Sequence, residues 1–298
     1  MIKYIAFFSD LREGTFPDFN NFFNLNLNTN KKILIIGPHI KNDHLNIIND
    51  PYFDIKILVI FEPIKNNLSN YQLCLTIVNN INLYKLNIFG SVNHNILEKK
   101  FKYPLYLIQW GFDYNQYNQF LKANNYIKDC NLEEKKFCCL INRWDPENHR
   151  TKIYNKLITI DKIFCPSVLL NNCSNDELNN IGKSNYINKF LFNICSENYD
   201  NNNIDGYITE KLMDCCLGCA IPIYAGWFDE YDEKIFNKNR IIFYNSNNNE
   251  SINDVFIKVK ELIDNKEKLL NFYRQPIFCD TAFDTIQKLK NDFLKNIN

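Results

Sequence analysis

The chain has 298 residues, with 34 lysine and arginine residues against 34 aspartate and glutamate residues, and 46% of its residues are hydrophobic. This length suits one large or two medium domains, each able to bury a core, and the balanced charge argues against a nucleic-acid-binding protein. No apolar run reaches the ~18 residues of a membrane span, and the N-terminal sequence lacks the pattern of a signal peptide. We therefore expect a cytoplasmic protein with no membrane span.

Short apolar runs rich in Ile, Val, Leu and Phe recur through the first half of the chain. They lack clean alternation of polar and apolar residues, as strands buried on both faces of a parallel sheet do. The predicted strands cover residues 4–8, 32–36, 55–61, 71–78 and 86–89. This half is predicted to be an α/β domain.

The charged stretch at residues 129–136 precedes a new series of apolar runs and is the best candidate for a domain boundary. We predict domains at residues 1–130 and 131–298. In the second, the predicted strands cover residues 137–141, 163–166, 189–194, 220–224 and 240–244. Helical patterns cover residues 151–158, 209–219 and 252–272, the last with Ser251 as its N-cap. Two consecutive α/β units predict paired Rossmann-like domains with a cleft between them.

Two common phosphate-binding motifs are missing from the sequence. There is no G-x-G-x-x-G after a first strand and no G-x-x-x-x-G-K-[ST]. Dinucleotide-binding and P-loop functions therefore lose their main support, and any phosphate has to be bound by other groups.

The most informative stretch of the sequence is residues 189–227. A predicted strand leads into a polar loop, after which Thr209 caps a helix whose first turn holds Glu210 and Lys211. A lysine at the positive end of a helix is unfavourable unless an anion is bound there, which suggests a phosphate site. The alternative is a solvated lysine on an ordinary capped helix.

The same stretch resembles the donor-binding signature of the α1,3/4-fucosyltransferases, glycosyltransferase family 10. S-E-N at residues 196–198 is followed by a loop, by Y-I-T-E-K-L at residues 207–212 and by an I-P-I-Y-A-G-W strand. Ser196 stands where the family usually has Phe, and the loop is longer than is typical. The resemblance implies donor contacts from Asn198, Tyr207, Glu210 and Lys211.

A second match lies upstream, in K-K-F-C-C-L-I-N-R-W-D-P-E-N-H-R at residues 135–150. It resembles the family's strand ending in V-S-N and the arginine that opens the next helix, with Ile141 in place of the serine. The resemblance assigns Asn142 and Arg150 to the donor site. Arginine suits this role because it can hold phosphate oxygens bidentately and stabilise a departing diphosphate. As a lone feature, Arg150 would be read as a surface residue.

A third match carries the candidate base. The predicted strand at residues 55–61 ends in Phe61-Glu62-Pro63, which resembles the family segment with its proposed catalytic base. A carboxylate at the carboxyl end of a buried strand could deprotonate an acceptor hydroxyl. Without the resemblance, Glu62 is equally an ordinary loop carboxylate.

The resemblance implies a GT-B fold, with two Rossmann-like domains facing each other across a cleft. Residues 1–130 would bind a glycan acceptor, and residues 131–298, with C-terminal helices, would bind the nucleotide-sugar donor. The implied activity is an inverting α1,3-fucosyltransferase that uses GDP-fucose without metal or other cofactor. Two alternatives remain open: the same fold using a different nucleotide sugar, and a non-catalytic protein that binds glycans or nucleotides.

Overall fold

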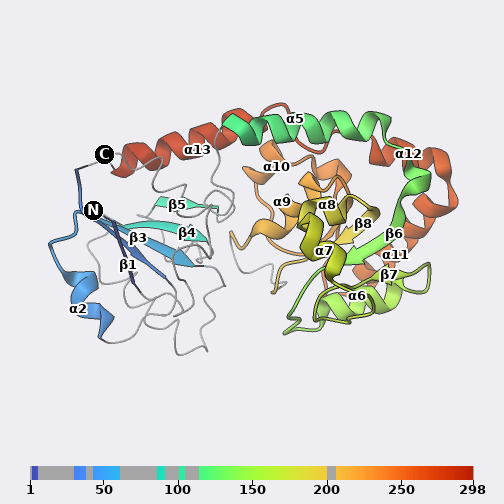
Figure 1. Ribbon diagram of the computed structural model, residues 1–298, viewed down its shortest axis with the longest axis horizontal. Helices are drawn as coiled ribbons and strands as arrows, with labels where there is room; N and C mark the ends of the chain where they lie inside the picture. Colours follow the sequence, from blue (N-terminus) through green and yellow to red (C-terminus); the bar gives the residue numbers. More distant parts are fainter. Residues whose placement is uncertain are drawn as a thin grey trace. The chain divides into compact units, whose positions relative to one another are not determined.

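The computed structural model describes residues 2–5, 30–37, 43–60, 86–90, 101–104, 114–199 and 206–297 (Figure 1). The chain divides into two compact units. The first comprises Met1–Phe112, Asn202–Glu210 and Asp284–Asn298, and the second comprises Asp113–Asn201 and Lys211–Phe283. The domain boundary at residues 130/131 stays a prediction.

The first unit is built on a five-stranded parallel sheet of order β1-β2-β3-β4-β5. Its strands are β1 (Ile2–Ile5), β2 (Ile33–Ile36), β3 (Ile55–Ile60), β4 (Leu86–Gly90) and β5 (Phe101–Tyr103), and α2 (His44–Asn49) follows β2. All four residues of β2 are buried. A strand covered on both faces needs apolar side chains on both, which explains the run I-L-I-I.

Three predicted strands of this half, at residues 32–36, 55–61 and 86–89, correspond to β2, β3 and β4. The predicted strand at residues 71–78 lies outside the described residues. The short strand β5 has no counterpart among the predictions because F-K-Y is too brief to form an apolar run. Its Tyr103 is buried and packs edge-on against Phe293, with ring centroids 5.3 Å apart.

The second unit contains another parallel five-stranded sheet, of order β10-β9-β8-β6-β7. Its strands are β6 (Lys136–Leu140), β7 (Ile163–Phe164), β8 (Phe190–Ile194), β9 (Ile221–Tyr224) and β10 (Ile242–Phe243). If β6 to β10 are renumbered 1 to 5 and the sheet is read from β7 to β10, the strand order is 2-1-3-4-5, which is a doubly wound order. The chain therefore turns to opposite sides after β6 and after β8, and such sheets bind ligands at the carboxyl ends of that strand pair.

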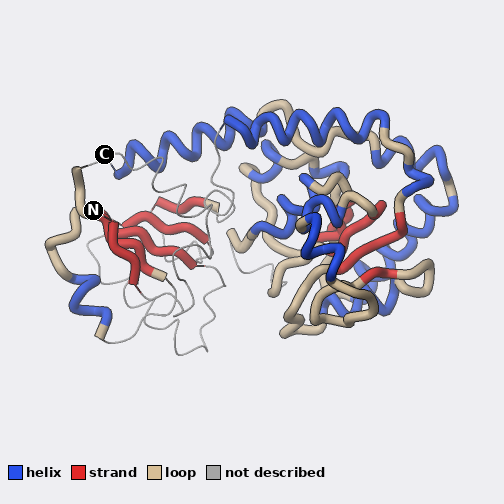
Figure 2. The backbone as a smooth tube through the Cα atoms, viewed as in Figure 1, coloured by secondary structure: helices blue, strands red, loops and turns tan. Residues whose placement is uncertain are grey.

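Helices accompany this sheet, as the blue segments around the red strands in Figure 2 show. They are α5 (Tyr114–Asp129), α6 (His149–Leu157), α7 (Asp176–Ile181), α8 (Lys183–Ile187), α9 (Glu210–Leu217), α10 (Asp232–Ile235), α11 (Asn249–Asp264) and α12 (Lys266–Tyr273). The last helix, α13 (Ala282–Ile297), belongs for most of its length to the first unit. The short 3-10 helices are η3 (Leu132–Glu134) and η4 (Lys238–Arg240). Within the described ranges, no helix combines the length and apolar character needed to cross a bilayer.

The helix predicted at residues 252–272 is two helices, α11 and α12. Asn265 separates them with an extended backbone (φ −129°, ψ 98°), and its side-chain oxygen accepts from the backbone N–H of Lys268 at 2.9 Å. One extended residue does not interrupt the hydrophobic periodicity, so the sequence pattern gives no sign of the break between the two helices. Asparagine ends a helix readily because its side chain can bond to the backbone of the next turn.

The predicted N-cap of this helix, Ser251, is also wrong. The cap is Asn248, whose side-chain oxygen accepts from the N–H groups of Glu250 and Ser251 at 2.8 and 3.3 Å. The Ser251 hydroxyl instead accepts from the N–H of Asn245 at 2.9 Å. Two good capping residues lie three positions apart, and the longer helix is the one that forms.

The helix α5 is polar overall, which explains why the apolar pattern did not predict it. It is fixed by Asn124, whose side-chain oxygen accepts from the N–H groups of Ile277 and Phe278 at 2.8 and 3.0 Å and whose amide donates to the Phe278 carbonyl at 2.9 Å. The ring of Phe120 stacks on that of Phe278 with centroids 4.1 Å apart.

A buried arginine fixes the segment that leads into β9. Arg240 is only 1% exposed. Its guanidinium donates to the carbonyls of Tyr273, Ala220 and Cys219 at 3.1, 2.8 and 3.0 Å. The side chain thereby joins the end of α12 to the turn between α9 and β9.

Replacing Arg240 with methionine should destabilise the protein by about 3 kcal/mol, because buried carbonyls left without a donor cost about 1–3 kcal/mol each. Denaturant unfolding would measure the change. The exposed Arg274 provides the control, and Arg274→Met should leave the unfolding midpoint close to that of the wild type. Equal midpoints for the two variants would contradict this role for Arg240.

Candidate functional site

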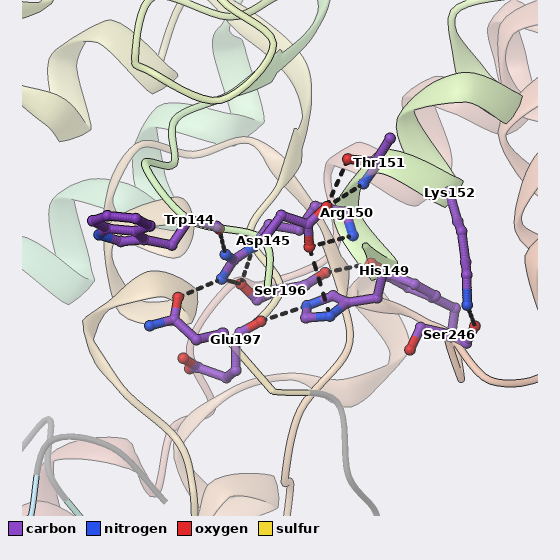
Figure 3. A network of polar contacts seen from close by, with 11 residues as sticks. Trp144, Asp145, His149, Arg150, Thr151, Lys152, Ser196, Glu197 and Ser246 are labelled. Atoms are coloured by element: carbon purple, nitrogen blue, oxygen red, sulfur yellow. Dashed lines mark hydrogen bonds and ion pairs between the residues drawn. The ribbon is translucent and has the colours of Figure 1, made fainter. Parts of the chain in front are cut away.

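The candidate site lies at the carboxyl ends of β6 and β8, on the two sides of the switch point (Figure 3). Residues 141–148 follow β6 and lead into α6, and residues 195–199 follow β8. Both segments belong to the second unit. They carry the two sequence motifs that resemble the donor-binding signature, so adjacent strands bring these motifs together.

Arg150 connects the two segments. Its side chain is fully buried. Nε and Nη2 donate to the carbonyl of Ser196 at 3.1 and 2.6 Å, Nη2 donates to Oδ1 of Asn198 at 2.9 Å, and Nη1 donates to the carbonyl of Trp144. A buried guanidinium has to be matched by acceptors, and here the acceptors come from both loops.

Asp145 fixes the start of α6 and with it the position of Arg150. One carboxylate oxygen accepts from the N–H of Arg150 at 3.2 Å, and the other accepts from the N–H and hydroxyl of Thr151 at 2.8 and 2.7 Å. The residue before the helix, Asn148, has a left-handed backbone (φ 56°) and makes no capping bond with its side chain. Asp145 therefore satisfies N–H groups that open the helix.

His149 connects the same helix to the segment after β8. Its Nε2 lies 2.6 Å from the carbonyl oxygen of Glu197, and its Nδ1 lies 3.8 Å from Oδ1 of Asp145. A carbonyl oxygen only accepts, so Nε2 carries the proton. Figure 3 shows the imidazole between these two residues.

Glu197 carries a carboxylate that is fully buried. One carboxylate oxygen lies 3.3 Å from Nζ of Lys211, whose side chain is 12% exposed. The hydroxyl of Tyr224 lies 3.5 Å from the other carboxylate oxygen and 3.1 Å from the carbonyl of Trp227, and its one proton is donated to one of these two acceptors at a time. The preceding residue, Ser196, has its hydroxyl 2.7 Å from that of Tyr244. Side chains from β9, the segment after β10 and α9 thus converge on residues 196–198.

The structure brings three of the predicted site residues together at the segment after β8. Arg150 contacts Asn198 directly, and Lys211 reaches the same segment through Glu197. Asn142 lies two residues beyond β6, where its carbonyl accepts from the N–H of Leu169 at 3.0 Å.

The remaining predicted site residues are placed individually. Tyr207 is buried, with 2% of its surface exposed, and Glu210 is partly exposed and begins α9. Both are grouped with the first unit. The candidate base, Glu62, lies outside the described residues.

Sequence reasoning missed the supporting residues Glu197, Asp145, His149 and Tyr224. Glu197 stands inside the S-E-N motif, so the motif itself could have drawn attention to it. Asp145 and His149 lie four positions apart, a spacing at which side chains can meet on one face of a helix start. Tyr224 has no local signal, because its contact with Glu197 depends on the pairing of β8 with β9.

Cysteines next to the site belong to the core. Burial raises the pKa of the thiols of Cys139, Cys215 and Cys216, so they remain protonated at neutral pH. Among the described residues no group of three or more His, Cys, Asp or Glu side chains could hold a metal ion.

Similarity to solved structures shows the fold. An alpha1,3-fucosyltransferase with GDP-fucose has a TM-score of 0.63 at 15% sequence identity, over 99% of this chain and 90% of that chain. An alpha1,3-fucosyltransferase with GDP has a TM-score of 0.62 at 16% identity, over 99% and 89%. A variant of S. aureus TarM with Fondaparinux, alpha-GlcNAc-glycerol and UDP has a TM-score of 0.52 at 12% identity, over 94% and 58%. The fold is GT-B, as predicted, with two Rossmann-like α/β units.

The family follows from the sequence of the second unit. The family model described as "Glycosyltransferase family 10 (fucosyltransferase) C-term" matches residues 130–281, just over half of the chain. The chain belongs to this family and is a glycosyltransferase, which confirms the resemblance. No curated protein matches the chain by sequence.

Replacing Asp145 with alanine should destabilise the protein by about 1–2 kcal/mol, the usual cost of a lost helix cap. Thermal and denaturant unfolding would measure it. Asp176 is an exposed acid in the first turn of α7 and provides a matched control. If Asp145→Ala were no more destabilising than Asp176→Ala, the capping role would be excluded.

Proposed function

We propose that this protein is an inverting α1,3-fucosyltransferase that moves fucose from GDP-fucose to a hydroxyl group of a glycan acceptor. The observation that carries the proposal is the cluster of Lys211, Glu197, Asn198 and Arg150 at the carboxyl ends of β6 and β8. This is the place where a doubly wound sheet binds a nucleotide. Family membership supports fucose as the transferred sugar.

Lys211 is the cation best placed for the donor diphosphate. Its side chain is partly exposed, and it lies in the first turn of α9, where a helix favours an anion. The other proposed donor contacts are Asn142, Arg150, Asn198, Tyr207 and Glu210. Residues 131–298 therefore form the proposed donor domain, and residues 1–130 form the proposed acceptor domain.

Arg150 has a different environment from Lys211. It is fully enclosed and its guanidinium is already bonded to protein oxygens, so in our proposal a phosphate oxygen joins or replaces one of these acceptors. The carbonyl of Trp144 is the acceptor that can be exchanged, because Trp144 is 73% exposed and lies in a loop. In our proposal Arg150 also orients the Asn198 amide, whose oxygen it binds.

The proposed reaction is a single displacement. The acceptor hydroxyl oxygen bonds to the anomeric carbon of fucose as its proton passes to the carboxylate of Glu62, and the bond from that carbon to the phosphate oxygen breaks. The diphosphate leaves with the added negative charge, which Lys211 and Arg150 stabilise. No metal or other cofactor takes part in this proposal.

Replacing Glu62 with glutamine removes the proposed base and keeps its size. Donor binding should stay within about twofold of wild type, while turnover should fall by about 100-fold or more. Thermal shift would report binding, and release of the nucleoside diphosphate in the presence of a glycan acceptor panel would report turnover. Full turnover by Glu62→Gln would remove Glu62 from the mechanism.

Comparison of donors separates the alternatives in the same assays. GDP-fucose should stabilise the wild-type protein and be consumed, while GDP-mannose and UDP-sugars should not be consumed. Turnover of one of those sugars instead would favour a different donor. Binding of GDP-fucose without turnover across the acceptor panel would favour a non-catalytic binding protein.

Replacing Lys211 with methionine should weaken GDP binding by about 1.5–3 kcal/mol, because a charge-assisted bond to phosphate is lost. Calorimetric titration with GDP would measure this. Lys183 provides a matched control, because its ammonium lies 2.6 Å from Asp214 in the same unit and is 34% exposed. Equal GDP affinity in Lys211→Met and Lys183→Met would refute the proposed role of Lys211.

A further inference from the structure

We infer that Glu197 is a positioning residue for the donor: its buried carboxylate holds the Lys211 ammonium in place for the donor diphosphate. The inference rests on the proposed function of Lys211 and goes beyond it, because it assigns a role to a residue that does not itself contact the donor. Glu197 and Lys211 come from separate elements, the segment after β8 and the first turn of α9.

The backbone of Glu197 is fixed on both sides. Its N–H donates to the carbonyl of Ala225 at 2.9 Å, which extends the pairing of β8 with β9 by one step. Its carbonyl accepts from Nε2 of His149 at 2.6 Å. With its backbone anchored in this way, Glu197 points its side chain into the interior, where the carboxylate is fully buried.

The neighbouring strand leaves space for this carboxylate. A Cβ atom on Gly226 would lie 2.8 Å from Cγ of Glu197 and 2.4 Å from the hydroxyl of Tyr224. Both distances are too short for real contacts, so any larger residue at position 226 would displace the acid or the phenol. The glycine therefore serves the packing around Glu197 and the neighbouring Tyr224 hydroxyl.

The charges of Glu197 and Lys211 explain how this pair would favour the binding of an anion. A buried carboxylate is costly without a cation, and a lysine in the first turn of a helix is disfavoured by the helix dipole. At 3.3 Å each group offsets the cost of the other. An ammonium can donate to three acceptors, so contact with Glu197 is compatible with contact to phosphate oxygens. Glu197 thus holds the Lys211 ammonium in one orientation before the donor arrives, which lowers the cost of binding.

A double-mutant cycle on the full chain tests this role, with GDP as the probe. Glu197→Gln should raise the Kd of GDP by about tenfold, as expected when a buried charge partner is lost. In a Lys211→Met background, Glu197→Gln should change the Kd by less than about twofold, because there is no ammonium left to position. A merely structural role would give the same fold-change in both backgrounds, and that result would overturn the inference.

Asp214→Asn is the matched control for the loss of an acid. Asp214 lies on α9, the helix that also carries Lys211, and it is paired with Lys183 of α8. Asp214→Asn should leave the Kd of GDP unchanged once folding is confirmed by circular dichroism. If Asp214→Asn weakened GDP binding as much as Glu197→Gln, a general loss of packing would explain both, and the inference would fail.

Gly226→Ala provides a second route if Glu197→Gln does not fold. The added methyl group crowds Cγ of Glu197, so it should raise the Kd of GDP in the wild-type background and not in the Lys211→Met background. Equal effects in both backgrounds would again overturn the inference. If Lys211→Met alone leaves the Kd of GDP unchanged, the proposed function of Lys211 fails first. If only the coupling is missing, the role of Glu197 alone is refuted.

Discussion

The buried guanidinium of Arg150 is the interaction on which the site depends. It binds the carbonyls of Trp144 and Ser196 and the amide oxygen of Asn198, so one rigid group sets the spacing of two loops that end neighbouring strands. Burying a charged group away from water is costly unless each of its N–H donors has a hydrogen-bond acceptor. Asp145 and His149 reinforce this arrangement by fixing the first turn of the helix that carries Arg150.

The two cations of the candidate site, Arg150 and Lys211, differ in how deeply they are buried. Arg150 is fully buried, and its hydrogen bonds to protein oxygens hold the two loops of the site together. Lys211 is partly exposed and is held by a carboxylate that belongs to the same S-E-N segment. Residues 196–198 therefore link both cations, and a change in this segment alters the positions of both. In the proposed function, a protein with no net charge presents local positive charge to a diphosphate in this way.

Much of the fold was readable from apolar runs. The strands β2, β3, β4, β6, β8 and β9 were predicted within a residue or two, because strands covered on both faces need apolar side chains throughout. The polar helix α5 was not, because a few contacts such as those of Asn124 hold it in place. The break at Asn265 was also missed, since one extended residue does not interrupt hydrophobic periodicity. Spacing in the sequence carries no record of such long-range contacts.

The sequence by itself determined the family, because the long ordered motifs at residues 135–150 and 189–227 can be recognised without knowledge of the structure. It also determined the α/β class and the positions of Arg150 and Lys211 near helix starts. Only the tertiary structure decided that Arg150 is enclosed and that Glu197 is the partner of Lys211. The reason is physical: these contacts exist because β6 and β9 both pair with β8, and strand order is set by packing of the whole sheet.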